Sequence, residues 1–222
     1  QLGRSGPFRT YIERCGKIRE GDIFVSNDPY ETEGEITHLP DICLVKPIFW
    51  EDKLVCFACS WAHSSDIGGS VPGSTSNYNY EIYQEGLRIP PVKLIDGGKL
   101  VESVAQIIKL NVRNPRDSWG DIQAQIAALN VAKEGMHDII TKHGVKVVTQ
   151  AQYDLMDWAE VRARAIIRNL PDGIFEFDEF LDDDGITEVP VCISVKIIKR
   201  KDEMIIDLTG TDDQLQSALN CP

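Results

Sequence analysis

Long apolar runs are missing from this chain, and basic residues are few. No stretch approaches the ~20 consecutive apolar residues that a membrane-spanning helix needs, and the chain does not start like a signal peptide. Lys and Arg number 23 against 35 Asp and Glu, which gives a formal net charge of −12. We therefore expect a soluble, cytoplasmic protein with no membrane contact, and we exclude a nucleic-acid binder because a phosphate backbone requires a basic surface.

Cysteine and histidine are also scarce. The six cysteines are scattered, and the single CxxC pair, Cys56 and Cys59, lies in an apolar strand pattern. We interpret this pair as core, because a zinc site needs a second pair and a redox pair needs a helix start. Two of the four histidines fall within residues 28–73. This stretch therefore becomes the candidate functional region.

The hydrophobic periodicity predicts strands at both ends of the chain and helices between them. Apolar residues recur with a helical period at about 101–110, 116–143 and 149–169, and strand patterns follow at 173–180, 188–199 and 203–208. Segregated strands and antiparallel helices predict an α+β fold. We treat 1–222 as a single region, expected to be part of a longer polypeptide, with a β-rich part at 1–100, a helical part at 101–170 and antiparallel strands at 171–222.

A β-hairpin is predicted for residues 42–49 and 54–61. Both runs are rich in Val, Ile, Leu, Phe and Cys, and a short polar turn at 50–53 separates them. With the turn centred in the middle of these four residues, the register places Asp41 opposite Ala62 and His63 opposite Pro40. Opposed residues have Cα atoms about 4.5–5.5 Å apart. The open end of the hairpin therefore gathers residues that are distant in sequence.

His38, Asp41 and His63 are expected to meet at this open end. Pro40 lacks an N–H group and holds the first two in extended or turn geometry. Two imidazoles and a carboxylate with open positions suit Zn, Mn or Fe. A His or Asp at a strand end is also commonly a surface or capping residue, and spacing alone leaves both interpretations open.

Two further acidic residues flank the predicted ligands. Asp28 follows a short strand and is a turn residue, a distant fourth ligand or an acceptor that fixes a histidine tautomer. Asp66 lies three residues after His63 and is a further ligand or a base. The loop that follows, which contains Gly68 and Gly69, is either a flexible connection or a substrate-binding segment that presents backbone N–H groups.

Arg88 and Glu85 complete the set of candidate site residues. The Arg88 guanidinium suits a carboxylate or a phosphate group, and Glu85 is a candidate general base, with a salt bridge between the two as the simpler alternative. Other clusters are assigned structural roles. The run Asp182–Gly185 is interpreted as a hairpin turn, and His137 and His143 as surface or capping residues.

Several motifs in one order resemble the hydantoinase B/oxoprolinase family, which also contains the corresponding subunits of acetone and acetophenone carboxylases. The resemblance extends from Gly21 to Gln214. Its motifs are GDIFVSNDPY (21–30), THLPDICLVKPIF (37–49), WAHSSDIGGSVPGS (61–74), EIYQEGLRIPPVKL (81–94) and GDIQAQIAALN (120–130).

This resemblance implies a B-type subunit of a hetero-oligomer, working with a hydantoinase A-type subunit or domain. The A component binds ATP and phosphorylates a lactam, imide or enolate oxygen of a small-molecule substrate, so ATP is not bound by this chain. The B component then hydrolyses or carboxylates the activated species. In the carboxylase branch, the residues matching His38, Asp41 and His63 bind a metal.

The resemblance also suggests roles for the other candidates. A divalent ion polarises the substrate oxygen or activates water, Asp66 or Asp28 accepts the proton, and Arg88 with Gly68 and Gly69 holds the phosphorylated oxygen or a carboxylate. The HLPD and HSSDIGG motifs are closer to the hydrolases, so an ATP-dependent cyclic amide hydrolase is predicted first. A carboxylase subunit and a non-catalytic structural subunit remain as alternatives.

Overall fold

The computed structural model describes Ile12 and residues 15–220, which form two compact units. Within these residues, the first unit comprises everything up to Ser76 together with Glu81–Thr149, and the second comprises Asn77–Tyr80 and Gln150–Asn220. The fold combines antiparallel sheets with helices, which confirms the predicted α+β class. Among the described residues, no helix is both long enough and apolar enough to cross a membrane.

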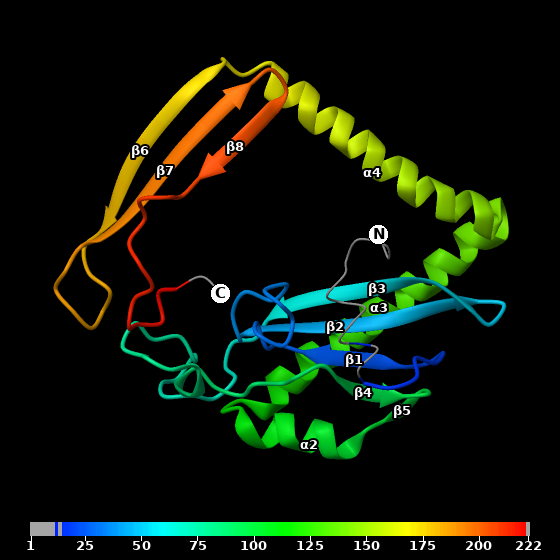
Figure 1. The fold of residues 1–222 in the computed structure, drawn as a ribbon. Coiled ribbons are helices and arrows are strands. Elements are labelled where there is room, and N and C mark those ends of the chain that lie inside the picture. Colours follow the sequence, from blue (N-terminus) through cyan, green and yellow to red (C-terminus); the bar gives the residue numbers. More distant parts are fainter. Residues whose placement is uncertain (1–11, 13–14, 221–222) are drawn as a thin grey trace. The chain divides into compact units, whose positions relative to one another are not determined.

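The first unit is built on a five-stranded sheet with the strand order β3-β2-β1-β4-β5 (Figure 1). Every neighbouring pair of strands is antiparallel. The central strand β1 is short and wholly buried, as expected for an apolar run with sheet on both sides. The strand bounds are β1 Ile23–Ser26, β2 Asp41–Trp50, β3 Lys53–His63, β4 Val92–Asp96 and β5 Lys99–Leu100.

The β2–β3 hairpin forms as predicted, but its register differs from the prediction. The turn residues Glu51 and Asp52 both have positive φ, 48° and 62°, as a two-residue turn of the primed type requires. A bulge then shifts the pairing, because Ile48 pairs with Cys56 whereas the next residue, Phe49, pairs with Leu54. The extra β3 residue moves all later pairs by one position.

The bulge places Asp41 directly opposite His63. The predicted pairs of Asp41 with Ala62 and of His63 with Pro40 are therefore wrong, although the predicted turn centre is right. The predicted register assumes one-to-one pairing of residues from the turn onward, so it cannot include an inserted residue. The sequence also has no glycine at the bulge that would indicate its position. The correction brings two predicted metal ligands closer together in the register.

Helices α2 (Glu102–Asn111) and α3 (Pro115–His143) pack on one face of this sheet (Figure 1). Alternation along β1 sends Ile23 and Val25 to this face, where they join Ile122 and Leu129 of α3 in the main core. The opposite face of the sheet carries a smaller hydrophobic cluster that includes Phe24 and Val45. His137 of α3 bonds to the Phe49 carbonyl at 2.9 Å, so it links the helix to β2 instead of capping a helix end.

Two strands, β4 and β5, were not predicted. The sequence Pro90-Pro91 indicates an interrupted ladder, but pairing begins immediately after it, with Val92 opposite Val25 of β1.

The third helix, α4, spans Val145–Arg168 and follows α3 after a single residue, Gly144, so it begins earlier than the predicted position of about 149. Local patterns located the elements but not the ends.

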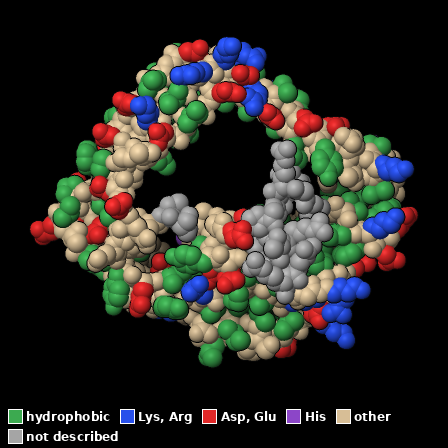
Figure 2. All heavy atoms as spheres, in the orientation of Figure 1, with side chains coloured by type: hydrophobic (Ala, Val, Ile, Leu, Met, Phe, Trp, Pro, Cys, Tyr) green, Lys and Arg blue, Asp and Glu red, His purple; other side chains and the backbone are tan. Residues whose placement is uncertain are grey.

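The second unit contains most of α4 and a three-stranded antiparallel sheet, β6 (Gly173–Leu181), β7 (Val191–Arg200) and β8 (Glu203–Asp207). The segment 182–190 between β6 and β7 is a loop, in which Asp184 accepts bonds from the Ile186 and Thr187 N–H groups. Figure 2 shows acidic and basic side chains interspersed over this unit. Arg168 and Asp202 form one of its ion pairs, at 2.9 Å. Phe175 and Phe177 on β6 are exposed, so the described residues give this unit little hydrophobic core.

Close backbone packing fixes the loop that follows β3. The Ser70 N–H group donates to the Gln84 carbonyl at 2.7 Å, and the Leu87 N–H group donates to the Ile67 carbonyl at 2.8 Å. Gly86 has φ of +127°, and a Cβ added there would lie 2.6 Å from the Ile67 carbonyl oxygen. Only glycine therefore permits this approach.

The close approach at Gly86 generates a stability prediction. Gly86→Ala should lower the free energy of unfolding by at least about 2 kcal/mol, because it adds a backbone clash to an unfavourable φ. Gly120→Ala in α3 is the matched control, since nothing lies within 4 Å of its added methyl group. The control should gain about 0.5–1 kcal/mol from helix propensity. Urea unfolding measures both, and equal stabilities would contradict the packing described.

Candidate metal centre and the adjoining cavity

His38, Asp41 and His63 converge at the open end of the β2–β3 hairpin. His38 lies just before β2, Asp41 is its first residue, and His63 is the last residue of β3. The Asp41 Oδ1 atom is 3.1 Å from His38 Nε2 and 3.0 Å from His63 Nδ1, and the two imidazole nitrogens are 3.2 Å apart. Within the described residues, this is the one group of His, Cys, Asp or Glu donors close enough to hold a metal ion.

These spacings fit a metal ion. Three ligands at right angles around an ion, with bonds of about 2.1 Å, lie about 3.0 Å apart, whereas tetrahedral ligands lie about 3.4 Å apart. Two imidazole lone pairs and a carboxylate at such short distances repel one another unless a cation or a proton lies between them. The side chains of His38 and His63 are 47% and 59% exposed. Further coordination positions therefore face solvent.

Neighbouring polar groups orient His38. Thr37 Oγ1 lies 3.2 Å from His38 Nδ1. When His38 Nε2 serves as a ligand, Nδ1 carries the proton and donates it to this hydroxyl, which fixes the tautomer. The turn itself is closed by a bond from the Asp41 N–H group to the His38 carbonyl and by one from Ser64 to the Pro40 carbonyl. The candidate metal ligands thus lie on hydrogen-bonded backbone.

Asn27 links the turn that carries His38 and Asp41 to the segment before β4. It is fully buried, and its Nδ2 group donates to the carbonyls of Leu39 and Leu87 at 2.7 and 2.8 Å. Its Oδ1 atom accepts the Ile89 N–H group at 2.7 Å. One side chain therefore joins the segment after His38 to the segment after Gly86. The sequence pattern did not indicate this role, although Asn27 lies in the GDIFVSNDPY motif.

Gln125 supports the hairpin from α3. Its Nε2 group donates to the carbonyls of Ile42 on β2 and Ser60 on β3, at 3.0 and 3.1 Å. A polar residue on the buried face of a helix is the sequence signal that could have identified it. These bonds hold the two strands and the helix together next to Asp41 and His63.

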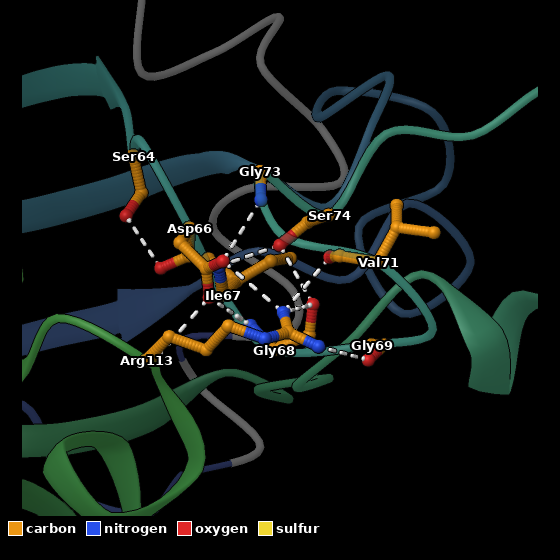
Figure 3. Close-up of polar contacts among 9 residues, drawn as sticks. All are labelled: Ser64, Asp66, Ile67, Gly68, Gly69, Val71, Gly73, Ser74 and Arg113. Atoms are coloured by element: carbon orange, nitrogen blue, oxygen red, sulfur yellow. Dashed lines mark hydrogen bonds and ion pairs between the residues drawn. The ribbon is translucent and has the colours of Figure 1, made fainter.

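Asp66 is enclosed by hydrogen-bond donors (Figure 3). Its carboxylate accepts the N–H groups of Gly68, Gly73 and Arg113 and an ion pair from the Arg113 side chain at 3.1 Å. Desolvation of the carboxylate opposes ionisation, but these bonds prevail and lower the pKa of Asp66 from 3.8 to about 2. The contacts favour a role in holding the loop, and the low pKa makes Asp66 a weak proton acceptor.

Arg113 contributes the other half of this network, and the sequence pattern did not reveal it. Its guanidinium also donates to the carbonyls of Gly68, Gly69 and Val71. The loop after His63 is therefore held by hydrogen bonds and an ion pair, and it is not a flexible connection (Figure 3). Gly68 packs against the Asn111 carbonyl, where an added Cβ would lie 2.4 Å away. This contact gives Gly68 a packing role.

The buried Asp28 and the half-buried Arg88 form an ion pair beside a cavity. Arg88 Nε lies 2.6 Å from Asp28 Oδ2, and the side chain of Asp28 is 3% exposed. The hydrogen bond raises the pKa of Arg88 above its usual value. Among the described residues, Arg88 makes no ion pair with Glu85, so the predicted salt bridge between them is wrong. Arg88 pairs with Asp28 instead, because Asp28 follows β1 and its carboxylate is buried within reach of the guanidinium.

The cavity brings some of the predicted substrate-binding residues together. It measures about 530 Å³, and its walls include Arg88, Gly69 and Asp28. Gly68 and Glu85 are not among the lining residues. Burial raises the pKa of Glu85, and the nearby charge of His38 opposes that rise. The full lining consists of Asp28, Glu31, Gly69, Tyr83, Gly86, Leu87, Arg88, Pro90 and Asn111.

Comparison with known proteins places this chain in a family. The chain is 35% identical over 187 residues to the beta subunit of the caprolactamase of Pseudomonas jessenii, a match that covers 84% of this chain and 32% of that protein. It is 34% identical over 233 residues to the B-type subunit of a putative D-/L-hydantoinase of Pseudomonas sp. (strain NS671), covering 99% and 39%. The chain thus spans roughly a third of the length of these curated relatives.

A solved structure supports the same placement. The ATP-dependent caprolactamase from Pseudomonas jessenii matches with a TM-score of 0.83 and 31% identity, over 99% of this chain and 37% of that one. The family model described as hydantoinase B/oxoprolinase matches residues 4–222. The resemblance inferred from the motifs is therefore confirmed, and the chain belongs to the hydantoinase B/oxoprolinase family.

Proposed function

We propose that this chain is the metal-containing B-type part of an ATP-dependent cyclic amide hydrolase of the hydantoinase or oxoprolinase type. The observation that carries the proposal is the convergence of His38, Asp41 and His63 at 3.0–3.2 Å in a member of this family. A divalent ion held there, Zn, Mn or Fe, supplies Lewis-acid polarisation of a carbonyl or enol oxygen.

The chain's own residues then have distinct tasks. His38, Asp41 and His63 hold the ion, and the exposure of both imidazoles leaves room for a substrate oxygen. Asp66 and Asp28 were predicted as proton acceptors, but both carboxylates are occupied by hydrogen bonds and arginine contacts. Glu85 stays the candidate general base, because burial raises its pKa above its usual value.

The ATP-dependent step is assigned to a partner. The relatives are subunits of a caprolactamase and of a putative hydantoinase, and the related solved structure is that of an ATP-dependent enzyme. In our proposal, a hydantoinase A-type subunit or domain binds ATP and phosphorylates the lactam or imide oxygen. The B-type part then receives the activated small molecule within a hetero-oligomer. ATP itself is not bound by this chain.

An activity assay separates this function from its alternatives. The full-length protein is combined with its A-type partner and ATP, and the loss of a lactam is compared with the bicarbonate-dependent consumption of a ketone. We expect ATP-dependent lactam hydrolysis without bicarbonate. Ketone consumption that requires bicarbonate would identify a carboxylase instead. Formation of the complex with neither activity towards a panel of lactams and ketones would favour a structural subunit.

The metal site generates a binding prediction. His38→Ala and His63→Ala should each weaken divalent-metal binding by at least about 100-fold, because either change removes a ligand. His143→Ala, in the last turn of α3, is the matched control and should bind one ion per chain as the wild type does. Metal content after dialysis and isothermal titration measure the effect. Wild-type metal content in both site variants, with the fold intact, would refute the assignment.

The Asp66 network generates a pH prediction. A pKa lowered from 3.8 to about 2 means that Asp66 stabilises the fold above pH 4, and that this stabilisation is lost as the pH falls towards 2. Asp66→Asn should cost about 2–4 kcal/mol at neutral pH, because several bonds to a charged group are lost. It should also remove this part of the acid dependence.

Denaturant unfolding between pH 2 and 7 checks this prediction. Asp138→Asn on the exposed face of α3 is the control, and it should retain the wild-type stability and acid dependence. An Asp66→Asn variant with wild-type stability at pH 7 would show that the loop does not depend on this carboxylate. A loss of hydrolysis without any loss of stability would instead restore Asp66 as a proton acceptor.

A further inference from the structure

The cavity at the sheet end that also carries His38, Asp41 and His63 is lined by an arginine whose orientation is fixed. Arg88 Nε is bound at 2.6 Å by Asp28 Oδ2. The other oxygen of Asp28 accepts the N–H groups of Tyr30 and Glu31 at 2.9 and 3.0 Å, so the acceptor cannot rotate freely. Arg88 is therefore tied at its Nε atom to a buried and immobilised carboxylate.

Two tyrosine rings further restrict the guanidinium plane. The Arg88 Cζ atom lies 5.8 Å from the ring centroid of Tyr30 and 5.6 Å from that of Tyr83, within the range of cation–π attraction. Both rings are largely exposed, at 63% and 74%. Tyr83 also lines the cavity, so its ring can contact the carbon skeleton of a ligand bound there.

The far edge of the guanidinium remains available for a ligand. Within the described part of the chain, neither Nη group of Arg88 makes a hydrogen bond, and the side chain is 28% exposed on the wall of the cavity. Two adjacent Nη groups present parallel N–H bonds, which match the two oxygens of a carboxylate. A fixed fork of this kind loses little side-chain entropy when it binds.

The local charge selects the kind of anion. Asp28 offsets the charge of Arg88, and Glu31 adds a second carboxylate to the lining. A dianionic phosphate would face both carboxylates with only one arginine to balance them, whereas a planar monoanion meets less repulsion. The cavity of about 530 Å³ is large enough for a small organic acid.

We propose that this cavity is a carboxylate subsite, in which the Nη edge of Arg88 binds the carboxylate of a small organic acid beside Tyr83. The subsite lies at the same sheet end as the metal ligands, because Asp28 follows β1, Asp41 begins β2 and His63 ends β3. Its link to turnover rests on the proposed function, since hydrolysis of any lactam converts the ring carbonyl into a carboxylate. The ligand is thus a ring-opened product or a substrate that already carries this group.

Isothermal titration of the full-length protein with isosteric probes tests the subsite. Hexanoate should bind, hexanamide should bind at least about 10-fold more weakly because it lacks the charge, and inorganic phosphate should not displace hexanoate. Arg88→Lys keeps the positive charge but loses the fork, and should weaken hexanoate binding by about 10-fold or more. Arg116→Lys, an exposed change in the first turn of α3, is the matched control and should bind as the wild type does.

Tyr83→Ala provides a second variant in case Arg88→Lys fails to fold. Tyr83 is 74% exposed, so its removal should spare stability and still weaken hexanoate binding. Equal binding of hexanoate and hexanamide, unchanged binding by both variants, or displacement by phosphate would each overturn the proposal. Metal content is measured in parallel. A wild-type protein without a bound metal would contradict the proposed function, whereas loss of hexanoate discrimination alone would contradict only the subsite.

Discussion

The site depends on the antiparallel pairing of β2 with β3, and in particular on the bulge near the turn of this hairpin. One extra residue on β3 moves the pairing by one position, so that Asp41 lies opposite His63 at the far end. Without the bulge, the two side chains would project from opposite faces of the sheet, because neighbouring residues alternate. The bulge at one end of the hairpin thus determines which side chains meet at the other end.

Buried polar side chains convert this pairing into a rigid site. Asn27 joins the turn after His38 to the segment that precedes β4, and Gln125 joins both hairpin strands to α3. Asp66 and Arg113 tie down the loop after His63. Each of these groups is satisfied by several bonds, which makes its loss costly in a low-dielectric interior. The side chains of His38 and His63 are themselves exposed, so their geometry comes from the residues beneath them.

The α+β class, the hairpin and the convergence of His38, Asp41 and His63 could be predicted because each depends on residues that are close together in the sequence. The polar turn between two apolar runs located the hairpin, and Pro40 kept His38 out of a helix. The bulge and the partner of Arg88 were not predictable in this way, because both depend on contacts between segments. Arg88 lies 60 residues from Asp28 but only three from Glu85, and the sequence favoured the nearer carboxylate. The role of Asp66 was obscured because its partner Arg113 lies on a distant segment.

The most direct test of this account is anomalous diffraction from crystals of the full-length protein, collected on both sides of the Mn, Fe and Zn absorption edges. We predict a single peak within bonding distance, about 2.0–2.2 Å, of His38 Nε2, Asp41 Oδ1 and His63 Nδ1. The absorption edge at which the peak appears would identify the metal. A metal peak bound by other residues, or no peak in protein that hydrolyses lactams, would contradict the central claim that the β2–β3 register builds a metal centre.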